Sequence, residues 1–208
     1  MKSFSTDNTG LRLPVAEDFY SVQGEGANAG KAAYFIRLAG CDVHCPFCDS
    51  KNTWNTDGKT VMHIDSIATR ASSSASKNVV ITGGEPLMHN LEPLCKALKD
   101  KGLSIWLETS GTHPISGMFD WICVSPKASR PPLDEVLDVA DELKAIITDA
   151  GSFDFAEQCA LKVPKRCSLT LQAEWDNRAA VYPLIFDYVL GHPEWKISIQ
   201  AHKILNIR

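Results

Sequence analysis

The sequence from residue 78 reads Asn78-Val79-Val80-Ile81-Thr82-Gly83-Gly84-Glu85-Pro86, and leucines at helical spacing follow over 87–98. The continuous apolar run is typical of a short strand buried on both faces. The glycines after it expose backbone N–H and C=O groups, and Glu85 adds a carboxylate where the strand ends. Pro86 suits the first turn of a helix. This stretch therefore predicts a strand, a ligand-binding turn and a helix in succession.

The same alternation extends in both directions along the chain. We expect strands over 18–22, 33–39, 78–82, 103–107, 121–124, 143–147, 168–171 and 195–199, and helices over 64–75, 87–98, 134–140, 153–163 and 177–189. Strands that alternate with helices indicate an α/β fold with a mainly parallel sheet, and polar residues at the strand ends place the site at its carboxyl edge. About six core strands are too few for a complete barrel of about 250 residues. We therefore predict an incomplete TIM-like barrel, whose open side is covered by another subunit or by the substrate.

The composition is that of one globular domain. The chain has 208 residues, of which 44% are hydrophobic, and we expect a single domain over 1–208 that begins with a loose arm over 1–15. The net charge of -4 does not favour nucleic-acid binding, and no apolar run approaches the roughly 18 to 20 residues that cross a bilayer. Seven cysteines without a secretory segment indicate a reducing compartment, which predicts a cytoplasmic protein.

A second decisive stretch, Cys41-Asp42-Val43-His44-Cys45-Pro46-Phe47-Cys48, follows the strand expected over 33–39. Structural zinc sites normally have four ligands, and no second cysteine pair follows at a suitable spacing. In a four-iron four-sulfide cluster each thiolate binds one iron, so three cysteines leave the fourth iron open. We expect a cluster and metal loop over 41–58. Buried apolar cysteines or a degenerate zinc knuckle are the alternatives.

Two further features point to a ligand. The turn Gln23-Gly24-Glu25-Gly26 contains glycines that let the backbone approach a bound molecule, although a simple hairpin turn explains it too. Arg37 lies on a predicted strand, where its guanidinium requires a carboxylate or phosphate, and a structural salt bridge is the alternative. Oxygen-bearing side chains such as Ser50, next to the cysteine loop, suit magnesium.

Together these motifs resemble those of the 7-carboxy-7-deazaguanine synthase family within the radical S-adenosylmethionine (SAM) superfamily. The cysteine triplet and the Gly-Gly-Glu-Pro turn are common to the superfamily, whereas Gln-Gly-Glu-Gly and Cys-Asp-Ser are specific to this family. The resemblance extends from about Phe19 to the C-terminus and rests on the stretches 22–26, 37–41, 48–50, 82–86, 108–111 and 125–127.

The resemblance implies a set of site residues. The cluster ligands would be Cys41, Cys45 and Cys48, with Ser50 on magnesium. The residues that hold SAM would be Gly84, Glu85, Ser110, Ser125, Pro126, Lys127, Gln172, Ala173, Glu174 and Trp175. The substrate would be bound by Val22, Gln23, Gly24, Arg37, Thr82 and the C-terminal Arg208. Because the turn 172–175 lacks the proline that is common in the superfamily, we expect contacts there through its backbone.

The resemblance also implies the reaction. A 4Fe-4S cluster, SAM and Mg²⁺ would convert 6-carboxy-5,6,7,8-tetrahydropterin to 7-carboxy-7-deazaguanine with release of ammonia, on the pathway to queuosine. SAM would supply the radical and be regenerated, so no catalytic side chain is expected beyond that cofactor-derived radical. The implied partners are the small-molecule pterin, an electron donor such as flavodoxin and a second copy of the chain in a homodimer.

Two other functions remain open from the sequence. An activase for a glycyl-radical enzyme has the same cysteine spacing, but it would need a surface for a large partner rather than a pterin pocket. A non-enzymatic iron-sulfur or zinc-binding module would leave Gly83-Gly84-Glu85-Pro86 without a role. Gln23, Gly24 and Glu25 together with Arg37 are the residues that distinguish a pterin enzyme from both.

Overall fold

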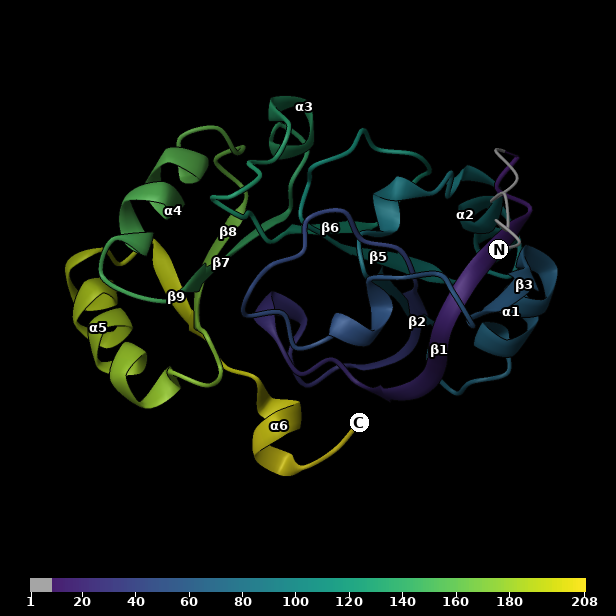
Figure 1. Ribbon diagram of the computed structural model, residues 1–208, viewed down its shortest axis with the longest axis horizontal. Coiled ribbons are helices and arrows are strands. Elements are labelled where there is room, and N and C mark those ends of the chain that lie inside the picture. The colour runs from purple at the N-terminus through teal and green to yellow at the C-terminus, as the bar shows by residue number, and fades with distance from the viewer. Residues whose placement is uncertain (1–8) are drawn as a thin grey trace.

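The structure, a computed structural model, describes residues 9–208. A curved sheet forms its centre, with most helices on the convex side and long loops within the concave side (Figure 1). The strands are β1 (Arg12–Val22), β2 (Ala32–Leu38), β3 (Thr60–His63), β4 (Asn78–Gly83), β5 (Ser104–Thr109), β6 (Trp121–Val124), β7 (Glu142–Ile147), β8 (Ser168–Ala173) and β9 (Trp195–Ser198). The α-helices are α1 (Ile64–Ser72), α2 (Glu92–Lys99), α3 (Asp134–Leu137), α4 (Ser152–Ala160), α5 (Arg178–Gly191) and α6 (Ala201–Leu205).

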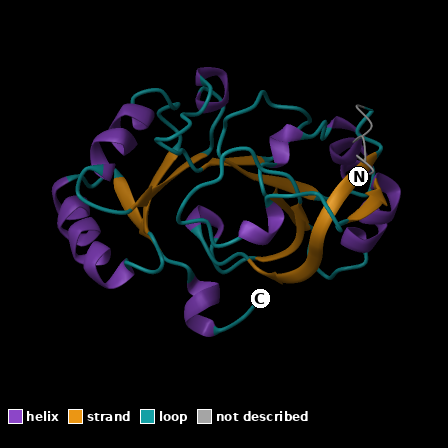
Figure 2. Ribbon diagram, viewed as in Figure 1, coloured by secondary structure: helices purple, strands orange, loops and turns teal. Residues whose placement is uncertain are grey.

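The strands form one nine-stranded sheet in the order β3-β1-β2-β4-β5-β6-β7-β8-β9. From β2 to β9 every neighbouring pair is parallel, whereas β1 pairs antiparallel with both β2 and β3. The predicted α/β fold with a mainly parallel sheet is therefore confirmed. All eight expected strands are present, and the ninth, the edge strand β3, was missed because it has only four residues and no continuous apolar run that would reveal it (Figure 2).

Alternation along each strand creates two separate layers of side chains. In β4, Val79 and Ile81 belong to the main core, which includes Leu94 and Leu98 of the outer helix α2. Val80, between them, belongs instead to a second cluster. Successive side chains of a strand point to opposite faces, so this second cluster lies on the concave face. Its members are Ala33, Phe35, Val80 and Trp106, with Phe19 and Trp121 packed against them.

Above this apolar layer the concave face becomes polar. Two residues after Phe35 and Val80, the same faces of β2 and β4 carry Arg37 and Thr82, which are directly opposite each other in the sheet. Glu108 occupies the corresponding position of β5, because Ile81 is opposite Leu107 in the preceding pair. The interior thus has an apolar floor and a charged upper layer close to the carboxyl ends of the strands.

The C-terminal segment runs from β9, at one edge of the sheet, across the opening to β1 and the loop that follows it. After β9, the backbone N–H of Ala201 donates to the carbonyl oxygen of Gly24, in the loop between β1 and β2. The Ser21 hydroxyl donates to the carbonyl oxygen of Arg208, and the Arg208 guanidinium pairs with Glu17 of β1. The chain's own helix α6 and tail therefore cover part of the side for which the sequence predicted only a partner or a substrate (Figure 1).

Two local predictions were wrong. The arm expected over 1–15 ends earlier, because β1 begins at Arg12, and the rest of the arm up to residue 8 lies outside the described residues. The helix expected over 87–98 is divided into a 3₁₀ turn, Pro86–Met88, and α2, which restarts at Glu92 with a proline in its first turn. The tail contains a helix, α6, that is too short for a periodic pattern to reveal it.

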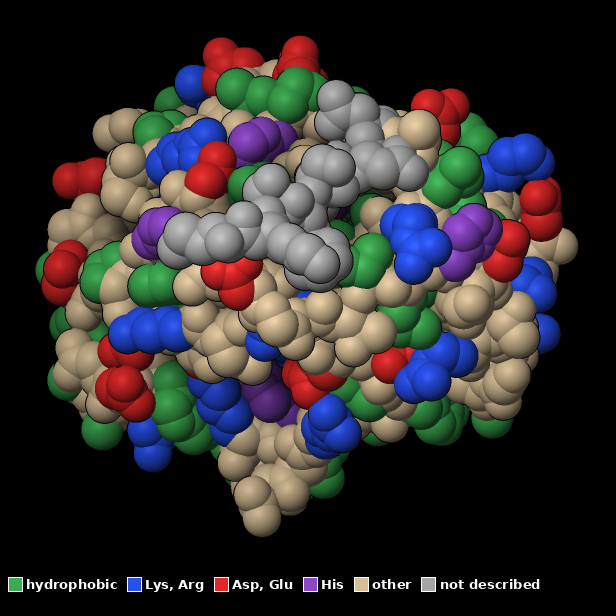
Figure 3. All heavy atoms as spheres, turned by 45° about the vertical axis from the view of Figure 1, so that its right-hand side comes forward, with side chains coloured by type: hydrophobic (Ala, Val, Ile, Leu, Met, Phe, Trp, Pro, Cys, Tyr) green, Lys and Arg blue, Asp and Glu red, His purple; other side chains and the backbone are tan. Residues whose placement is uncertain are grey.

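The surface agrees with the composition. Within residues 9–208 no helix combines the length and apolar character that crossing a bilayer requires. On the face in Figure 3, described acidic and basic side chains are interspersed over the strands and helices, without a large patch of one sign.

Candidate active site

A pocket of about 370 Å³ lies on the concave side, at the carboxyl ends of the parallel strands. Its volume is in the range of small-molecule sites. Of all the residues that the sequence assigned to a site, only Pro126 is not in its lining. The others that line it are Val22, Gln23, Gly24, Arg37, Cys41, Cys45, Cys48, Ser50, Thr82, Gly84, Glu85, Ser110, Ser125, Lys127, Gln172, Ala173, Glu174, Trp175 and Arg208.

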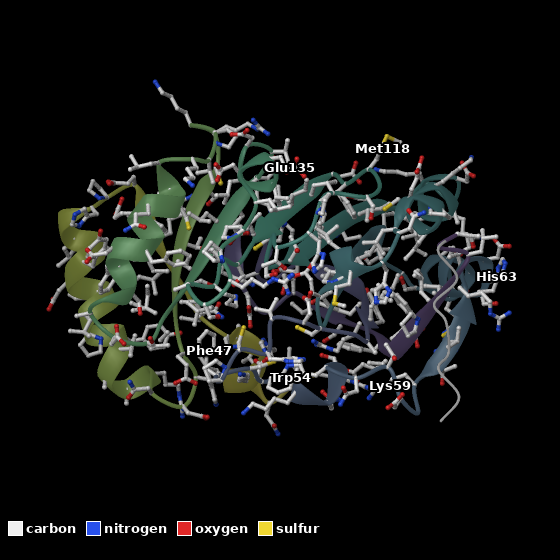
Figure 4. All side chains as sticks on the ribbon, turned by 45° about the horizontal axis from the view of Figure 1, so that its top comes forward. Phe47, Trp54, Lys59, His63, Met118 and Glu135 are labelled. Carbon is white, nitrogen blue, oxygen red and sulfur yellow. The ribbon has the colours of Figure 1, made fainter. Side chains whose placement is uncertain are left out.

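The cysteine loop forms one wall of this pocket. Its start is held by two backbone hydrogen bonds, from Gly40 N to Thr53 O (2.7 Å) and from Cys41 N to Trp54 O (3.1 Å). The backbone of His44 has φ 51°, and its ring lies 4.7 Å from that of Trp54. Figure 4 labels Phe47 and Trp54, which both line the pocket, on the side of the molecule opposite Met118 and Glu135.

The three cysteines fit an iron-sulfur cluster. All are free thiols at the pocket wall, whereas the other four cysteines are buried in the fold. Burial raises the pKa of the Cys45 thiol, and the two neighbouring cysteines raise it further. Within residues 9–208 no three His, Cys, Asp or Glu side chains converge on a single ion, and a cluster, unlike zinc, places each thiolate on a separate iron. The buried indole N–H of Trp54 has no acceptor among the described residues.

Two glycines allow backbone segments to meet at the pocket. A Cβ atom on Gly84 would lie 2.2 Å from the carbonyl oxygen of Gly40, so the Gly-Gly-Glu-Pro turn packs directly on the segment that joins β2 to the cysteine loop. A Cβ atom on Gly24 would lie 2.3 Å from the ring nitrogen Nδ1 of His202. Both approaches require the absence of a side chain.

Glu85 is buried, and its hydrogen bonds are already satisfied within the protein. Oε1 accepts from Leu87 N (3.0 Å) and Thr109 Oγ1 (2.6 Å), while Oε2 accepts from Ser110 N (2.8 Å) and Ser110 Oγ (2.5 Å). A carboxylate has about four acceptor sites, so these bonds use all of them. The side chain therefore joins the ends of β4 and β5, and the backbone groups of Gly84 and Glu85 are better suited to contact a ligand.

The turn after β8 shows the same division between side chain and backbone. Gln172 Oε1 accepts from Ser198 Oγ (2.7 Å), and the Glu174 carboxylate accepts from the N–H groups of Asp176 and Asn177. These side chains are thus engaged internally, which agrees with the predicted backbone contacts. The ring of Trp175 lies beneath two cations, Arg178 at 4.1 Å and Lys203 at 4.9 Å from its centroid.

At the rim of the pocket, Arg37 lies between a carboxylate and the cysteine loop. Its Nε donates to Glu17 Oε1 (2.9 Å) and its Nη1 donates to Ser50 Oγ (3.2 Å). Arg208 pairs with the other oxygen of Glu17 at 2.5 Å. We call Glu17, Arg37 and Arg208 the rim cluster. The salt bridge that was considered as an alternative for Arg37 exists, and the guanidinium also lines the pocket.

Deeper in the pocket lies a charged group that the sequence did not reveal. Lys144 Nζ donates to Glu25 Oε2 (2.7 Å) and to Glu108 Oε2 (2.9 Å). Gln23 Nε2 donates to the other oxygen of Glu108 (3.0 Å), and Gln200 Nε2 to the other oxygen of Glu25 (2.8 Å). We call Glu25, Glu108 and Lys144 the inner cluster.

A signal for the inner cluster was present in the sequence. Lys144 interrupts the otherwise apolar run 143–147 of a predicted strand, and a charged residue at such a position requires a buried partner. Alternation places it on the concave face, and only β6 separates its strand, β7, from β5, which carries Glu108 near its end. The third member, Glu25, belongs to a loop distant in sequence.

Helix α6 adds two further residues to the pocket. Lys203 Nζ pairs with Asp49 Oδ2 of the cysteine loop at 2.8 Å. His202 lines the pocket beside Gly24, and burial lowers the pKa of its imidazole. The sequence assigned neither residue to the site.

Comparison with known proteins agrees with this arrangement. Residues 22–113 match the family described as a 4Fe-4S single cluster domain. The chain is 50% identical over 198 residues to the 7-carboxy-7-deazaguanine synthase of Synechocystis sp., which covers 95% of both chains. It is 46% identical over 198 residues to the enzyme of the same name from Flavobacterium psychrophilum, covering 95% of this chain and 94% of that one.

A solved structure shares the fold. The crystal structure of QueE from Escherichia coli superposes with a TM-score of 0.82 at 28% sequence identity, over 95% of this chain and 100% of that one. With an identity of up to 50% over nearly the full length of both proteins, the chain belongs to the 7-carboxy-7-deazaguanine synthase family.

Proposed function

We infer that the protein is a radical SAM lyase that contracts the ring of 6-carboxy-5,6,7,8-tetrahydropterin to form 7-carboxy-7-deazaguanine, with release of ammonia, in queuosine biosynthesis. One observation carries this inference. The residues that the family motifs nominate lie far apart in the sequence, yet with the exception of Pro126 they line one pocket. The identity with named synthases supports the same conclusion.

In this proposal Cys41, Cys45 and Cys48 hold the 4Fe-4S cluster and Ser50 holds Mg²⁺. SAM bound at the cluster supplies a 5′-deoxyadenosyl radical. The turn that contains Gly84 and Glu85 presents backbone groups to SAM, because the Glu85 carboxylate is already saturated. The remaining residues that would contact SAM are Ser110, Ser125, Pro126, Lys127 and the turn 172–175.

The substrate would lie between the apolar floor and the cysteine loop. Arg37 offers a guanidinium to the carboxylate of the pterin, and the fork of donors suits that group. Val22, Gln23, Gly24 and Thr82 would contact the rings, with Arg208 at the mouth. Helix α6 and the tail would exclude water, since they bridge the opening from β9 to β1.

The fold and its surroundings are part of the proposal. The curved sheet would be an incomplete TIM-like barrel, and residues 1–208 a single radical SAM domain with its cluster and metal loop over 41–58. The seven free thiols suit a cytoplasmic location, where an electron donor such as flavodoxin would reduce the cluster.

A homodimer is supported by apolar surface near the C-terminus. In α5, Phe186 and Leu190 are exposed one turn apart, and in α6 Ile204 and Leu205 are exposed. A second copy of the chain would cover such surface. Light scattering of the purified protein tests this part independently of its activity.

The experiment that tests the function is anaerobic reconstitution with iron and sulfide. The brown protein, given dithionite, SAM, Mg²⁺ and the carboxytetrahydropterin, is expected to form the deazaguanine and ammonia. The triple variant C41A/C45A/C48A should lose both the colour and the turnover. A protein that assembles the cluster and binds SAM but leaves the pterin unchanged would favour an activase instead.

A further inference from the structure

The inner cluster has no role in the function proposed so far. Lys144 is only 6% exposed, and its ammonium bonds two carboxylates that come from different parts of the chain, Glu25 and Glu108. All three side chains line the pocket. A buried ion pair is weak support for stability, because removing two charges from water is expensive. Its presence at the wall of a ligand site therefore calls for a second explanation.

The inner cluster and Arg37 lie at different points of the same layer. Arg37, Thr82 and Glu108 occupy one level across β2, β4 and β5. Neighbouring strands are about 4.8 Å apart, so Arg37 and Glu108 start on the order of 10 Å apart. A ligand that reaches both must offer an anion at one end and hydrogen-bond donors further along.

The carboxylates of the inner cluster retain capacity to accept hydrogen bonds. Glu25 accepts from Lys144, Gln200 and Gln172, and Glu108 accepts from Lys144, Gln23 and the thiol of Cys123. A carboxylate has about four acceptor sites, so each has about one left. A reduced pterin carries N–H groups on both rings and a carboxylate at one end, which matches this arrangement.

Two carboxylates close together in a buried site do not both ionise unless a cation lies between them. Burial acts to raise the pKa of Glu25, but the ammonium of Lys144 and the surrounding hydrogen bonds outweigh it and lower the pKa to about 2. Burial likewise acts to lower the pKa of Lys144, and the two glutamates reverse that effect. Glu25 and Lys144 thus maintain each other in their charged forms.

We propose that Lys144 is a positioning residue, which holds the Glu25 and Glu108 carboxylates in place and aimed at the ring N–H groups of the pterin. The proposal rests on the proposed function for the identity of the ligand. It assigns Arg37 to the carboxylate end and the inner cluster to the donor-rich rings. A merely structural ion pair would leave substrate affinity independent of the charge state of the two glutamates.

The test measures binding rather than turnover. The reconstituted protein with SAM is titrated with the carboxytetrahydropterin by calorimetry from pH 6 to 9, without a reductant so that no reaction occurs. In Lys144→Met the Glu25 carboxylate loses the cation that keeps its pKa low and should bind a proton at neutral pH, so affinity relative to wild type should fall by about 10- to 100-fold and recover as the pH rises. SAM affinity should not change.

Lys162→Met is the matched control, since it removes an exposed lysine that pairs with Asp134 on the outside of the fold. It should bind the pterin as the wild type does. A Lys144→Met protein with wild-type affinity, or with the same loss at every pH, overturns the proposal. Turnover by the wild-type protein is measured in parallel, so a failure of the proposed function is recognised separately.

If Lys144→Met does not fold, as circular dichroism would show, the double variant K144M/E108Q replaces it. This variant removes one ammonium and one carboxylate together, so Glu25 is left without its cation. Its pterin affinity should still rise with pH relative to wild type, because the ammonium that lowers the pKa of Glu25 is absent. An affinity ratio that does not depend on pH overturns the proposal.

Discussion

The inner cluster and the rim cluster contain the same kinds of groups in opposite proportion and at different depths. The inner cluster has two carboxylates and one cation, with exposed fractions of 6% for Lys144 and 18–19% for its glutamates. The rim cluster has two guanidiniums and one carboxylate, and its exposed fractions rise from 23% for Arg37 to 65% for Arg208. One pocket therefore has a fixed negative wall and an adjustable positive edge.

Depth decides what each cluster can do. Charges at the rim are screened by water and salt, so pairs among them contribute about 0 to 1 kcal/mol. Charges in the inner cluster are hardly screened, and loss of one partner leaves the others buried without compensation. The inner cluster should therefore affect stability, protonation and binding together, whereas the rim cluster should affect binding alone.

The largest expected effect is on stability. Lys144→Met leaves two buried carboxylates without their cation, and the free energy of unfolding should fall by about 3 to 5 kcal/mol at neutral pH. Arg208→Ala at the rim should change it by about 1 kcal/mol or less. Urea unfolding followed by circular dichroism measures both. Equal losses in the two variants would show that depth does not separate the clusters.

The second effect is a loss of stability at acid pH that is due to Glu25. Its pKa in the folded protein, about 2, lies below the ordinary 4.5, so its contribution is present above pH 4.5 and is lost as the pH falls toward 2. The contribution is on the order of 3 kcal/mol. The titratable groups coupled to Glu25 are Lys144, Asp49, Tyr182 and His202.

Glu25→Gln isolates this contribution of Glu25 to the free energy of unfolding. The difference in free energy of unfolding between wild type and variant should shrink as the pH falls from 5 to 3. Acid unfolding monitored by tryptophan fluorescence at fixed urea provides the measurement. A difference that stays constant over this range would show that a group other than Glu25 causes the loss of stability.

Much of the fold could be predicted because it depends on local patterns. The run 78–86 specifies a buried strand and its turn without reference to the rest of the chain, and the cysteine motif is contiguous. Neighbouring motifs then converge because parallel strands place their carboxyl ends at one edge. This explains why residues as distant as Gln23 and Lys127 line the same pocket.

The inner cluster could not be predicted from local patterns in the same way. Its members come from a loop and two strands, and Glu25 reaches Lys144 across 119 positions of sequence. Their contact depends on how far the sheet curves, which no local pattern specifies. The restart of α2 at Glu92 and the short helix α6 were missed for a simpler reason, since each depends on a few residues rather than on a repeat.

The third prediction concerns Arg37, the least exposed member of the rim cluster. Arg37→Met should raise KM for the pterin by about 10- to 100-fold with a smaller change in kcat, because the interaction is made in the ground state. Arg37→Lys should have a KM between those of the wild type and Arg37→Met, since lysine keeps the charge but loses the fork of donors. Stability should change little. A KM equal to that of wild type in Arg37→Met would remove Arg37 from substrate binding.

The smallest expected effect tests whether the rim is adjustable. Burial acts to raise the pKa of Glu17, and the guanidiniums of Arg208 and Arg37 outweigh it, so Glu17 is ionised and competes with the substrate for Arg37. Glu17→Gln should therefore lower KM at low salt by about two- to five-fold, which corresponds to about 0.5 to 1 kcal/mol.

Salt distinguishes competition from positioning at this residue. At 1 M salt the Debye length is about 3 Å, so the gain from Glu17→Gln should largely disappear. Initial rates at several pterin concentrations in low and high salt provide the comparison. If KM rises in this variant instead, Glu17 orients the guanidinium of Arg37 rather than competing for it, and the rim is then as preorganised as the inner cluster despite its exposure.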